Sequence, residues 1–256
     1  EKKDDSGKLT EVVSVRAMLK IKSKKFKYNS YIFQPMQVDV TLGPDEGIIA
    51  IEKADLCGVT ITGIIKVSDQ SVEFYLVPKS QNKQLESTLS CLSNQKASAS
   101  GNFNLGGEIM AQAKPETTNR FFSGDLDFSA DNGRIYRLGL LAKLFAVLNI
   151  TEIYRGEAPD LTGEGFAYNT MEIKANFEGK KLVMQQCAID GASMNIACEG
   201  EIDFVDNKIN LIILVAPFKT VDRIVKRIPL VGGVLGGKII SIPFRAKGDL
   251  DDPDVI

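Results

Sequence analysis

Hydrophobic and polar residues alternate with a period of two along most of the chain. From residue 13 to residue 22 every second side chain is valine, alanine, leucine or isoleucine, and residues 37–42 alternate in the same way. Successive side chains of a strand point to opposite faces, so this period is typical of strands that bury one face and expose the other. The sequence therefore predicts a chain made mostly of half-buried strands.

Further segments with this pattern are separated by Gly, Asn and Asp residues, which favour turns. The segments are 48–54, 59–67, 71–77, 97–105, 108–113, 121–129, 170–177, 181–189, 193–198, 201–204, 208–215 and 238–249. A short theme, in which glycine opens a strand of alternating polar and apolar residues, begins at Gly101, Gly124, Gly200 and Gly248. We expect a mainly β fold with a few short α-helices, in which repeated hairpins build an elongated, curved antiparallel sheet shaped as a half-barrel or groove.

Three segments follow a helical period instead. Residues 83–92 place leucines on one face, residues 136–148 are rich in leucine with few polar interruptions, and residues 221–228 have an apolar side and a basic side. We expect the second helix to plug or cap part of an apolar concave face of the sheet. The basic side of the third helix, Arg223, Lys226 and Arg227, is a candidate for membrane contact, with packing beneath the sheet as the alternative.

Length and charge narrow the class of protein. A chain of 256 residues with 44% hydrophobic residues can bury a substantial core. The chain divides into an N-terminal β-rich part of a groove, residues 1–130, and a C-terminal β region with the apolar helix, residues 131–256, unless both form one continuous domain.

The chain has 31 basic and 33 acidic residues, so no overall positive field attracts nucleic acid. We therefore expect no nucleic acid as a partner.

The residue types available for chemistry are restricted. The chain has no histidine, which removes the commonest general base and the commonest zinc ligand. Pairs of acidic residues such as Asp125 and Asp127 are interpreted as the solvated side of a strand, because no third acid converges on them in the sequence. We therefore expect no catalytic residue, no metal site and no cofactor; a hydrolase that uses unpaired acids and serines is a third hypothesis, for which we name no site.

The four cysteines, Cys57, Cys91, Cys187 and Cys198, are not spaced as zinc or thiol-redox motifs. They are either buried free thiols or disulfides formed in an oxidising compartment. If they are disulfides, proximity along the chain favours Cys57–Cys91 and Cys187–Cys198 among the three pairings that four cysteines allow.

No apolar stretch reaches the ~20 residues that a membrane-spanning helix requires, and no segment has the pattern of a signal peptide. We expect any membrane anchor to lie outside these residues.

Several stretches of the second half resemble the C-terminal region of AsmA-like proteins. The resemblance rests on residues 124–128 (GDLDF), 132–136 (NGRIY) and 140–150 (LLAKLFAVLNI). It continues through residues 163–166, 189–194, 200–204, 215–217, 242–243 and 248–253. These motifs are structural rather than catalytic, and residues 1 to about 120 share only the general style of strands with glycine turns.

The resemblance implies a non-enzymatic domain related to bacterial bridge-like lipid-transfer proteins, which hold lipid in the trough of a curved β-sheet. It implies a periplasmic location, attachment to the inner membrane through a segment outside this chain, phospholipid as the ligand, and envelope proteins as further partners. The alternative is a scaffold or chaperone-like module that binds protein during outer-membrane assembly. The residues expected to contact acyl chains are Leu141, Leu144, Leu148, Ile173, Ala175, Phe177, Met194, Ile196, Leu211, Ile213 and Val215.

Overall fold

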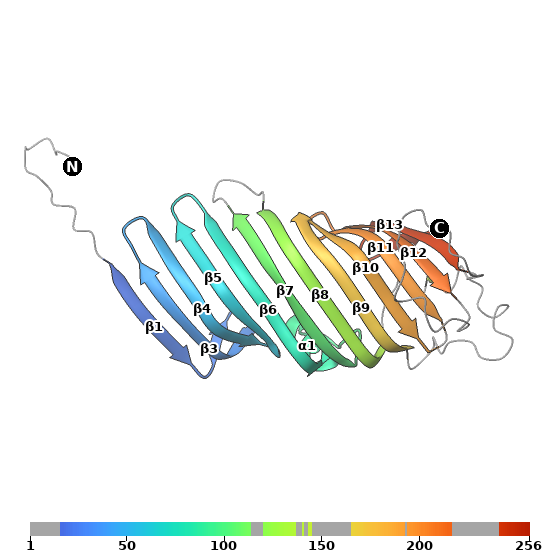
Figure 1. The fold of residues 1–256 in the computed structure, drawn as a ribbon, viewed down its shortest axis with the longest axis horizontal. Helices are drawn as coiled ribbons and strands as arrows, with labels where there is room; N and C mark the ends of the chain where they lie inside the picture. Colours follow the sequence, from blue (N-terminus) through green and yellow to red (C-terminus); the bar gives the residue numbers. More distant parts are fainter. Residues whose placement is uncertain are drawn as a thin grey trace, which may run out of the picture.

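The structure, a computed structural model, describes residues 16–113, 120–136, 140, 143–144, 165–192, 194–216 and 241–256. Over these residues the chain forms a single antiparallel sheet of 14 strands and one complete helix, α1 (Figure 1). The elements are β1 (Ala17–Ser23), β2 (Phe26–Tyr28), β3 (Tyr31–Leu42), β4 (Glu46–Leu56), β5 (Val59–Ser68), β6 (Val72–Gln84), α1 (Leu85–Ser93), β7 (Asn102–Ala113), β8 (Arg120–Ile135), β9 (Phe166–Gly179), β10 (Lys181–Gly191), β11 (Asn195–Asp203), β12 (Lys208–Ala216), β13 (Ile242–Asp249) and β14 (Pro253–Val255).

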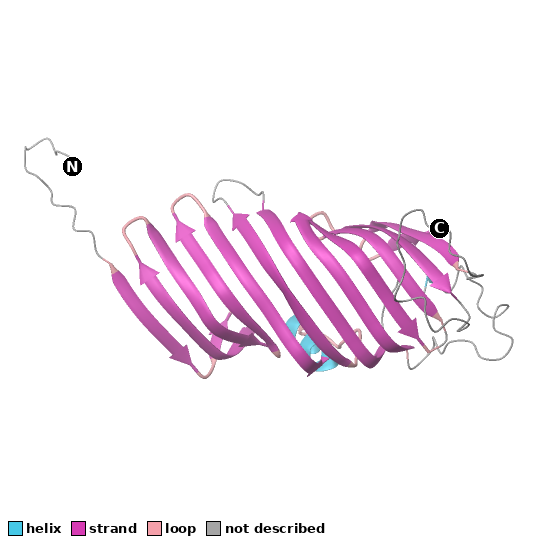
Figure 2. Ribbon diagram, in the orientation of Figure 1, coloured by secondary structure: helices cyan, strands magenta, loops and turns pink. Residues whose placement is uncertain are grey.

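The strands follow one another across the sheet in nearly the same order as in the chain. β3 pairs with both β1 and β2, and from β3 to β14 each strand pairs with the next. The result is an elongated, curved meander whose strands run across its long axis (Figure 2). The mainly β fold and the curved, groove-like antiparallel sheet predicted from the alternation are confirmed.

One face of this sheet is continuously apolar, and we call it the apolar face. A single cross-strand row, in which each residue pairs directly with the next, crosses it from β1 to β14. Every member is apolar or glycine: Ile21, Val38, Ile51, Gly63, Leu76, Ile109, Gly124, Phe177, Leu182, Ile202, Ile209, Gly248 and Pro253.

The opposite face, which we call the polar face, carries the row that lies one residue away along each strand. Its members are Lys20, Asp39, Ala50, Ile64, Tyr75, Met110, Ser123, Glu178, Lys181, Asp203, Lys208 and Asp249. Most of these side chains are charged or polar, as expected for a strand face in contact with water. Because side chains alternate, the register that places one row on the apolar face places the other in solvent.

Glycines bend the strands from within. Gly124 and Gly200 adopt φ values of 131° and 134° inside β8 and β11, a region of backbone conformation that side chains disfavour. A Cβ atom would lie 2.0 Å from the carbonyl oxygen of Glu108 at Gly124, and 2.2 Å from that of Asn210 at Gly200. The expectation that glycine opens a strand is therefore wrong for these two residues, since each lies within a strand where the neighbouring backbone approaches closely. It is also wrong for Gly248, which lies near the end of β13, whereas Gly101 directly precedes β7 as expected.

The same effect corrects several strand boundaries. Segments 97–105 and 108–113 form one strand, β7, which starts at Asn102 and continues through Gly106 and Gly107. Segments 193–198 and 201–204 likewise join in β11, through Gly200. Glycine between alternating segments predicts a turn, but in this sheet it also allows a long strand to bend without a break. The boundary expected between residues 130 and 131 falls inside β8, and the division into domains stays a prediction.

Helix α1 lies within one or two residues of the segment predicted at 83–92. Leu85 is buried in the main core, together with Val59 and Phe103. Thr88 Oγ1 donates a hydrogen bond of 2.8 Å to the carbonyl oxygen of Cys57, which ties the helix to the turn between β4 and β5.

The helix predicted at residues 136–148 is only partly within the described residues. Leu140, Lys143 and Leu144 are helical, whereas Tyr136 is not. The helix predicted at residues 221–228, with Arg223, Lys226 and Arg227, lies outside the described residues, as do Leu141 and Leu148.

Candidate functional site

A cavity of about 410 Å³ opens on the apolar face among the C-terminal strands. Its volume is within the ~300–1,000 Å³ typical of ligand pockets. The residues that line it are Ile135, Leu140, Leu144, Met171, Ile173, Met184, Cys187, Ile189, Ile196, Cys198, Ile202, Ile209, Leu211, Ile213, Leu250, Asp251 and Pro253. Asp251 is the one ionisable side chain among them, so the wall is almost wholly aliphatic and sulfur-containing.

Strand register brings these side chains together. Cys187 pairs directly with Cys198, which in turn pairs with Ile213, so three neighbouring strands contribute one residue each to the same row. Ile189 and Ile196 pair in the next row of the same face. Because the strands alternate, each of them supplies every second residue to the cavity wall.

Two disulfides connect parts of the sheet. Cys57 pairs with Cys91, which fastens α1 to the turn between β4 and β5, and Cys187 pairs with Cys198 in the cavity wall. Their Cα atoms lie 5.7 Å and 4.9 Å apart, respectively, within the normal range for a disulfide. This is the pairing that the sequence predicts.

Three helical residues, Leu140, Lys143 and Leu144, lie at or beside the cavity. Leu140 and Leu144 line the cavity, and Leu144 is fully buried. Lys143 forms an ion pair with Asp252 and donates a hydrogen bond of 2.7 Å to the carbonyl oxygen of Pro253. These polar contacts hold the leucines beside β14.

The residues predicted to contact acyl chains fall into three groups in the structure. Leu144, Ile173, Ile196, Leu211 and Ile213 line the cavity. The second group shares the apolar face or the main core without lining the cavity, and consists of Ala175, Phe177, Met194 and Val215. Leu141 and Leu148 belong to the third, which lies outside the described residues.

Sequence reasoning missed several lining residues. Ile135, Met171, Met184, Ile189, Ile202 and Ile209 were not named, although all but Ile135 lie at apolar positions of the predicted alternating segments. Following the alternation along every C-terminal strand, rather than along selected ones, would have found most of them. Leu250 and Pro253 carry no comparable signal, because they follow a glycine and a run of acidic residues.

Four phenylalanines form a cluster beside the cavity. Phe122 lies 6.3 Å from Phe74, 6.4 Å from Phe177 and 5.3 Å from Phe204, measured between ring centroids. Phe177 and Phe204 are 6.1 Å apart in an edge-to-face arrangement. These distances are typical of favourable aromatic pairs. The cluster extends the apolar surface from β6 in the first half of the chain to the turn after β11.

The wall of the cavity offers apolar surface that a ligand could bury. The described residues contain no group of three or more histidine, cysteine, aspartate or glutamate side chains placed to hold a metal ion. Burial, and next the charge of Asp131, raises the pKa of Tyr168 to about 12, so this phenol stays protonated near neutral pH. Its hydroxyl donates to the carbonyl oxygen of Ser100 at 2.6 Å, a structural contact outside the cavity.

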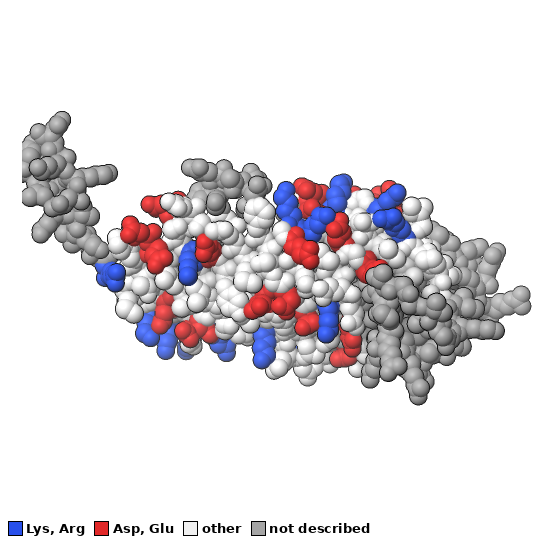
Figure 3. Space-filling model, turned by 45° about the horizontal axis from the view of Figure 1, so that its top comes forward, with Lys and Arg blue, Asp and Glu red and all other residues white. Residues whose placement is uncertain are grey.

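Charged side chains of both signs are spread over the side of the molecule shown in Figure 3. Among the residues that the structure describes, no helix has both the length and the apolar character needed to cross a membrane.

An open meander with one continuous apolar face and an aliphatic cavity defines a β-groove protein suited to apolar ligands. A family model described as YhdP protein matches residues 17–255. The chain belongs to the YhdP family, an AsmA-like family of bridge-like lipid-transfer proteins. The match includes the first half of the chain, where the resemblance to AsmA-like proteins was only general; that the chain is a C-terminal region stays a prediction. Searches among curated proteins and among solved structures gave no match.

Proposed function

We propose that this chain binds phospholipid acyl chains on its apolar face and conducts them between the inner and outer membranes of the cell envelope. The observation that carries the proposal is the unbroken row of apolar residues and glycines from Ile21 to Pro253, which leads past the aliphatic cavity. Such a row offers an apolar surface along the whole sheet, and membership of the YhdP family supports its use for lipid.

The energetics of such a site require no motif. Removing apolar surface from water contributes about 25 cal/mol per Å², so an acyl chain that lies along the row is bound by area rather than by directional contacts. The flexible side chains in the wall, such as Met171 and Met184, suit a ligand of variable shape. Asp251 is the one ionisable residue that lines the cavity, and a polar headgroup would lie beside it.

The two disulfides support the proposed location. Disulfides persist in oxidising compartments such as the bacterial periplasm and are rare in the cytosol. Cys57–Cys91 and Cys187–Cys198 therefore favour an envelope location, with attachment to the inner membrane through a segment outside this chain.

The test is lipid extraction and mass spectrometry of the protein purified from bacterial cells under native conditions. We expect co-purified phospholipid in the parent protein and its loss in Ile213→Asp, which places a carboxylate in the cavity wall, where Ile213 is 2% exposed. The matched control is Ile212→Asp, the next residue of β12 on the polar face, 45% exposed, which should retain lipid. Because Ile213→Asp can fail to fold, Ile202→Asp at a half-buried lining position is the second variant.

Each outcome decides the question. Lipid present in the parent and in Ile212→Asp, but absent from a folded Ile202→Asp, supports the proposal. Absence of acyl lipid from the parent, or unchanged lipid in every folded variant, overturns it and favours the scaffold hypothesis.

A further inference from the structure

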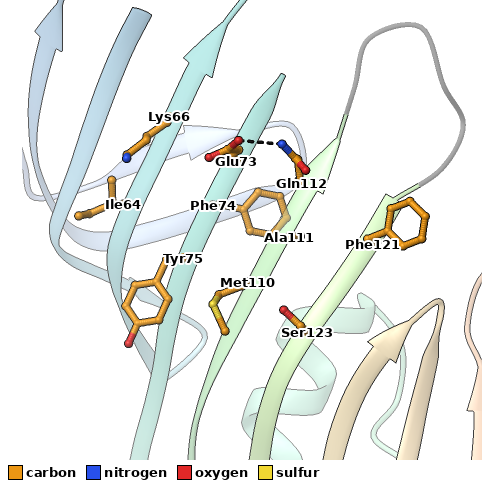
Figure 4. A pocket seen from close by; sticks show the side chains of 10 residues that line it. All are labelled: Ile64, Lys66, Glu73, Phe74, Tyr75, Met110, Ala111, Gln112, Phe121 and Ser123. Carbon is orange, nitrogen blue, oxygen red and sulfur yellow. Dashed lines mark hydrogen bonds between the residues drawn. The ribbon is translucent and has the colours of Figure 1, made fainter. Parts of the chain in front are cut away.

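A second hollow, of about 650 Å³, lies on the opposite side of the sheet from the cavity. It extends over β5, β6, β7 and β8, and Figure 4 shows the side chains around it. The polar-face row loses its polar character at this place, because Ile64, Tyr75 and Met110 pair with one another across three strands. All three are exposed, as is Phe121 at the edge of the hollow.

These exposed side chains are not part of the apolar face. Alternation predicts polar residues at their positions, since they point away from the main core. Tyr, Met and Phe are enriched in the centres of protein interfaces, and an exposed apolar patch with a polar rim marks an interaction site. The rim here includes Lys66 and the pair of Glu73 and Gln112, which are joined by a hydrogen bond of 2.8 Å (Figure 4).

The charge beside the hollow is negative. Glu108 and Asp125 lie directly opposite each other on β7 and β8, an arrangement of like charges that destabilises a sheet. Tyr75 donates a hydrogen bond of 2.7 Å to Glu108, but over the described residues no ion pair includes either carboxylate. A cation supplied from outside would relieve the repulsion between Glu108 and Asp125.

We propose that this hollow binds a basic, amphipathic helical segment of a partner protein. The apolar side of the segment would cover Ile64, Tyr75 and Met110, and a lysine or arginine would reach Glu108 and Asp125. Neighbouring strands lie ~4.8 Å apart, so four strands span ~14 Å, the length of ~10 helical residues. This surface is separate from the apolar face, so the proposal does not depend on lipid binding.

The first test uses a synthetic helical peptide of about 14 residues, long enough to cross the four strands, with leucine on one side and lysine on the other. Binding to the full chain is measured by fluorescence anisotropy. The expected result is saturable binding that weakens as salt is added and is absent for the same peptide with glutamate in place of lysine. Equal binding of the acidic peptide overturns the proposal.

The site is tested with Met110→Lys, which places a cation in the hollow. The matched control is Ile212→Lys, an exposed isoleucine of the polar face on β12, outside the hollow. We expect Met110→Lys to weaken peptide binding by at least about tenfold, the effect of losing a central interface residue, and Ile212→Lys to change it less than about twofold. Asp125→Asn, at an exposed position, is the second variant and should reduce the salt dependence.

The same variants distinguish the proposed partner segment from other molecules that could occupy the hollow. If the parent protein self-associates in sedimentation experiments and Met110→Lys abolishes this, the occupant is a second copy of the chain. If vesicles of anionic phospholipid bind the parent and not Met110→Lys, the occupant is a membrane surface. Either result overturns the partner segment, as does equal peptide binding by Met110→Lys and Ile212→Lys.

Discussion

The two halves of the sheet share one apolar row but bury it to different extents. On β1, the first strand, Leu19 and Ile21 point to the apolar face and are exposed. On β12, Ile209 belongs to the same row as Ile21, and Leu211 and Ile213 point to the same face; all three are buried within the main core. The first strands have a small separate core around Met36, Val38 and Ala54, and the main core begins only at Val59. The pattern of the sequence is the same in both, so the difference comes from what covers the face.

The difference indicates where other residues of the chain cover the apolar face and where they leave it exposed to solvent. In the closed second half the strands pack with Leu140 and Leu144, which leaves a cavity of limited size. At the β1 edge of the first half, Leu19, Ile21 and Leu42 are exposed on the apolar face, and contiguous exposed apolar surface marks a site of interaction. The proposed function assigns this open surface to acyl chains.

The largest expected effect is a difference in the free energy of unfolding between leucine substitutions in the two halves. Leu211→Ala removes a side chain that is 4% exposed, whereas Leu19→Ala removes one that is 50% exposed. We expect Leu211→Ala to lower the free energy of unfolding by about 2–5 kcal/mol, through lost burial and the cavity that remains. Leu19→Ala should cost less than about 1 kcal/mol, because little surface is uncovered. Denaturant titration of the purified variants measures both.

The comparison breaks if the two substitutions cost the same. A large loss for Leu19→Ala would mean that the first half is covered in solution, for example by bound lipid, and delipidated protein would then show a smaller loss. A small loss for Leu211→Ala would mean that the second half is not closed.

The sequence predicted the sheet well because alternation is a local property. Residues 17–22, 37–42 and 208–215 lie in strands. In the first two segments the apolar residues other than Met18 point to one face, whereas β12 also carries Ile212 on the polar face. The helix predicted at residues 83–92 is confirmed as α1, since three leucines on one side give a clear period. The ends of strands were harder to predict, because Gly107 and Gly200 bend strands that continue past them.

The site could be predicted only in part. Ile196, Leu211 and Ile213 were named from the alternation and line the cavity. The contrast between Leu19 and Leu211 could not be predicted, because burial depends on contacts between segments that are distant in the chain. The hollow on the polar face was missed for the opposite reason: Ile64, Tyr75 and Met110 meet only through strand register, and each is unremarkable within its own segment.

A smaller effect on stability is expected from the glycines that bend the strands in both halves of the sheet. Gly63 in β5 and Gly200 in β11 have φ values of 144° and 134°, and at each a Cβ would meet a backbone oxygen, at 2.1 Å and 2.2 Å respectively. We expect Gly63→Ala and Gly200→Ala each to lower stability by about 1–3 kcal/mol. Gly106→Ala is the control, because a Cβ there has nothing within 4 Å. Urea titration decides, and a loss confined to Gly200→Ala would assign the bend to the closed half alone.

The smallest expected effect is on the pH dependence of stability, and it compares one tyrosine from each half of the sheet. Tyr168 in β9 is 3% exposed, and Tyr75 in β6 is 39% exposed. Burial raises the pKa of Tyr168 to about 12. The hydrogen bond to Glu108 raises the pKa of Tyr75, but its exposure leaves the effect on stability screened by solvent. The two residues therefore differ in how strongly alkaline pH should act through them.

For Tyr168, the unfolded chain loses the phenolic proton near pH ~10, while the folded protein keeps it to about 12. Between these values the folded state binds more protons than the unfolded state, so its contribution to stability is complete below pH ~10 and falls as pH rises, by up to about 1.4 kcal/mol per unit. Thermal unfolding between pH ~9 and ~12 should show a shallower decline for Tyr168→Phe than for the parent, whereas Tyr75→Phe should follow the parent. Equal slopes for Tyr168→Phe and the parent would show that water reaches this hydroxyl, and that the second half of the sheet is less closed than its burial indicates.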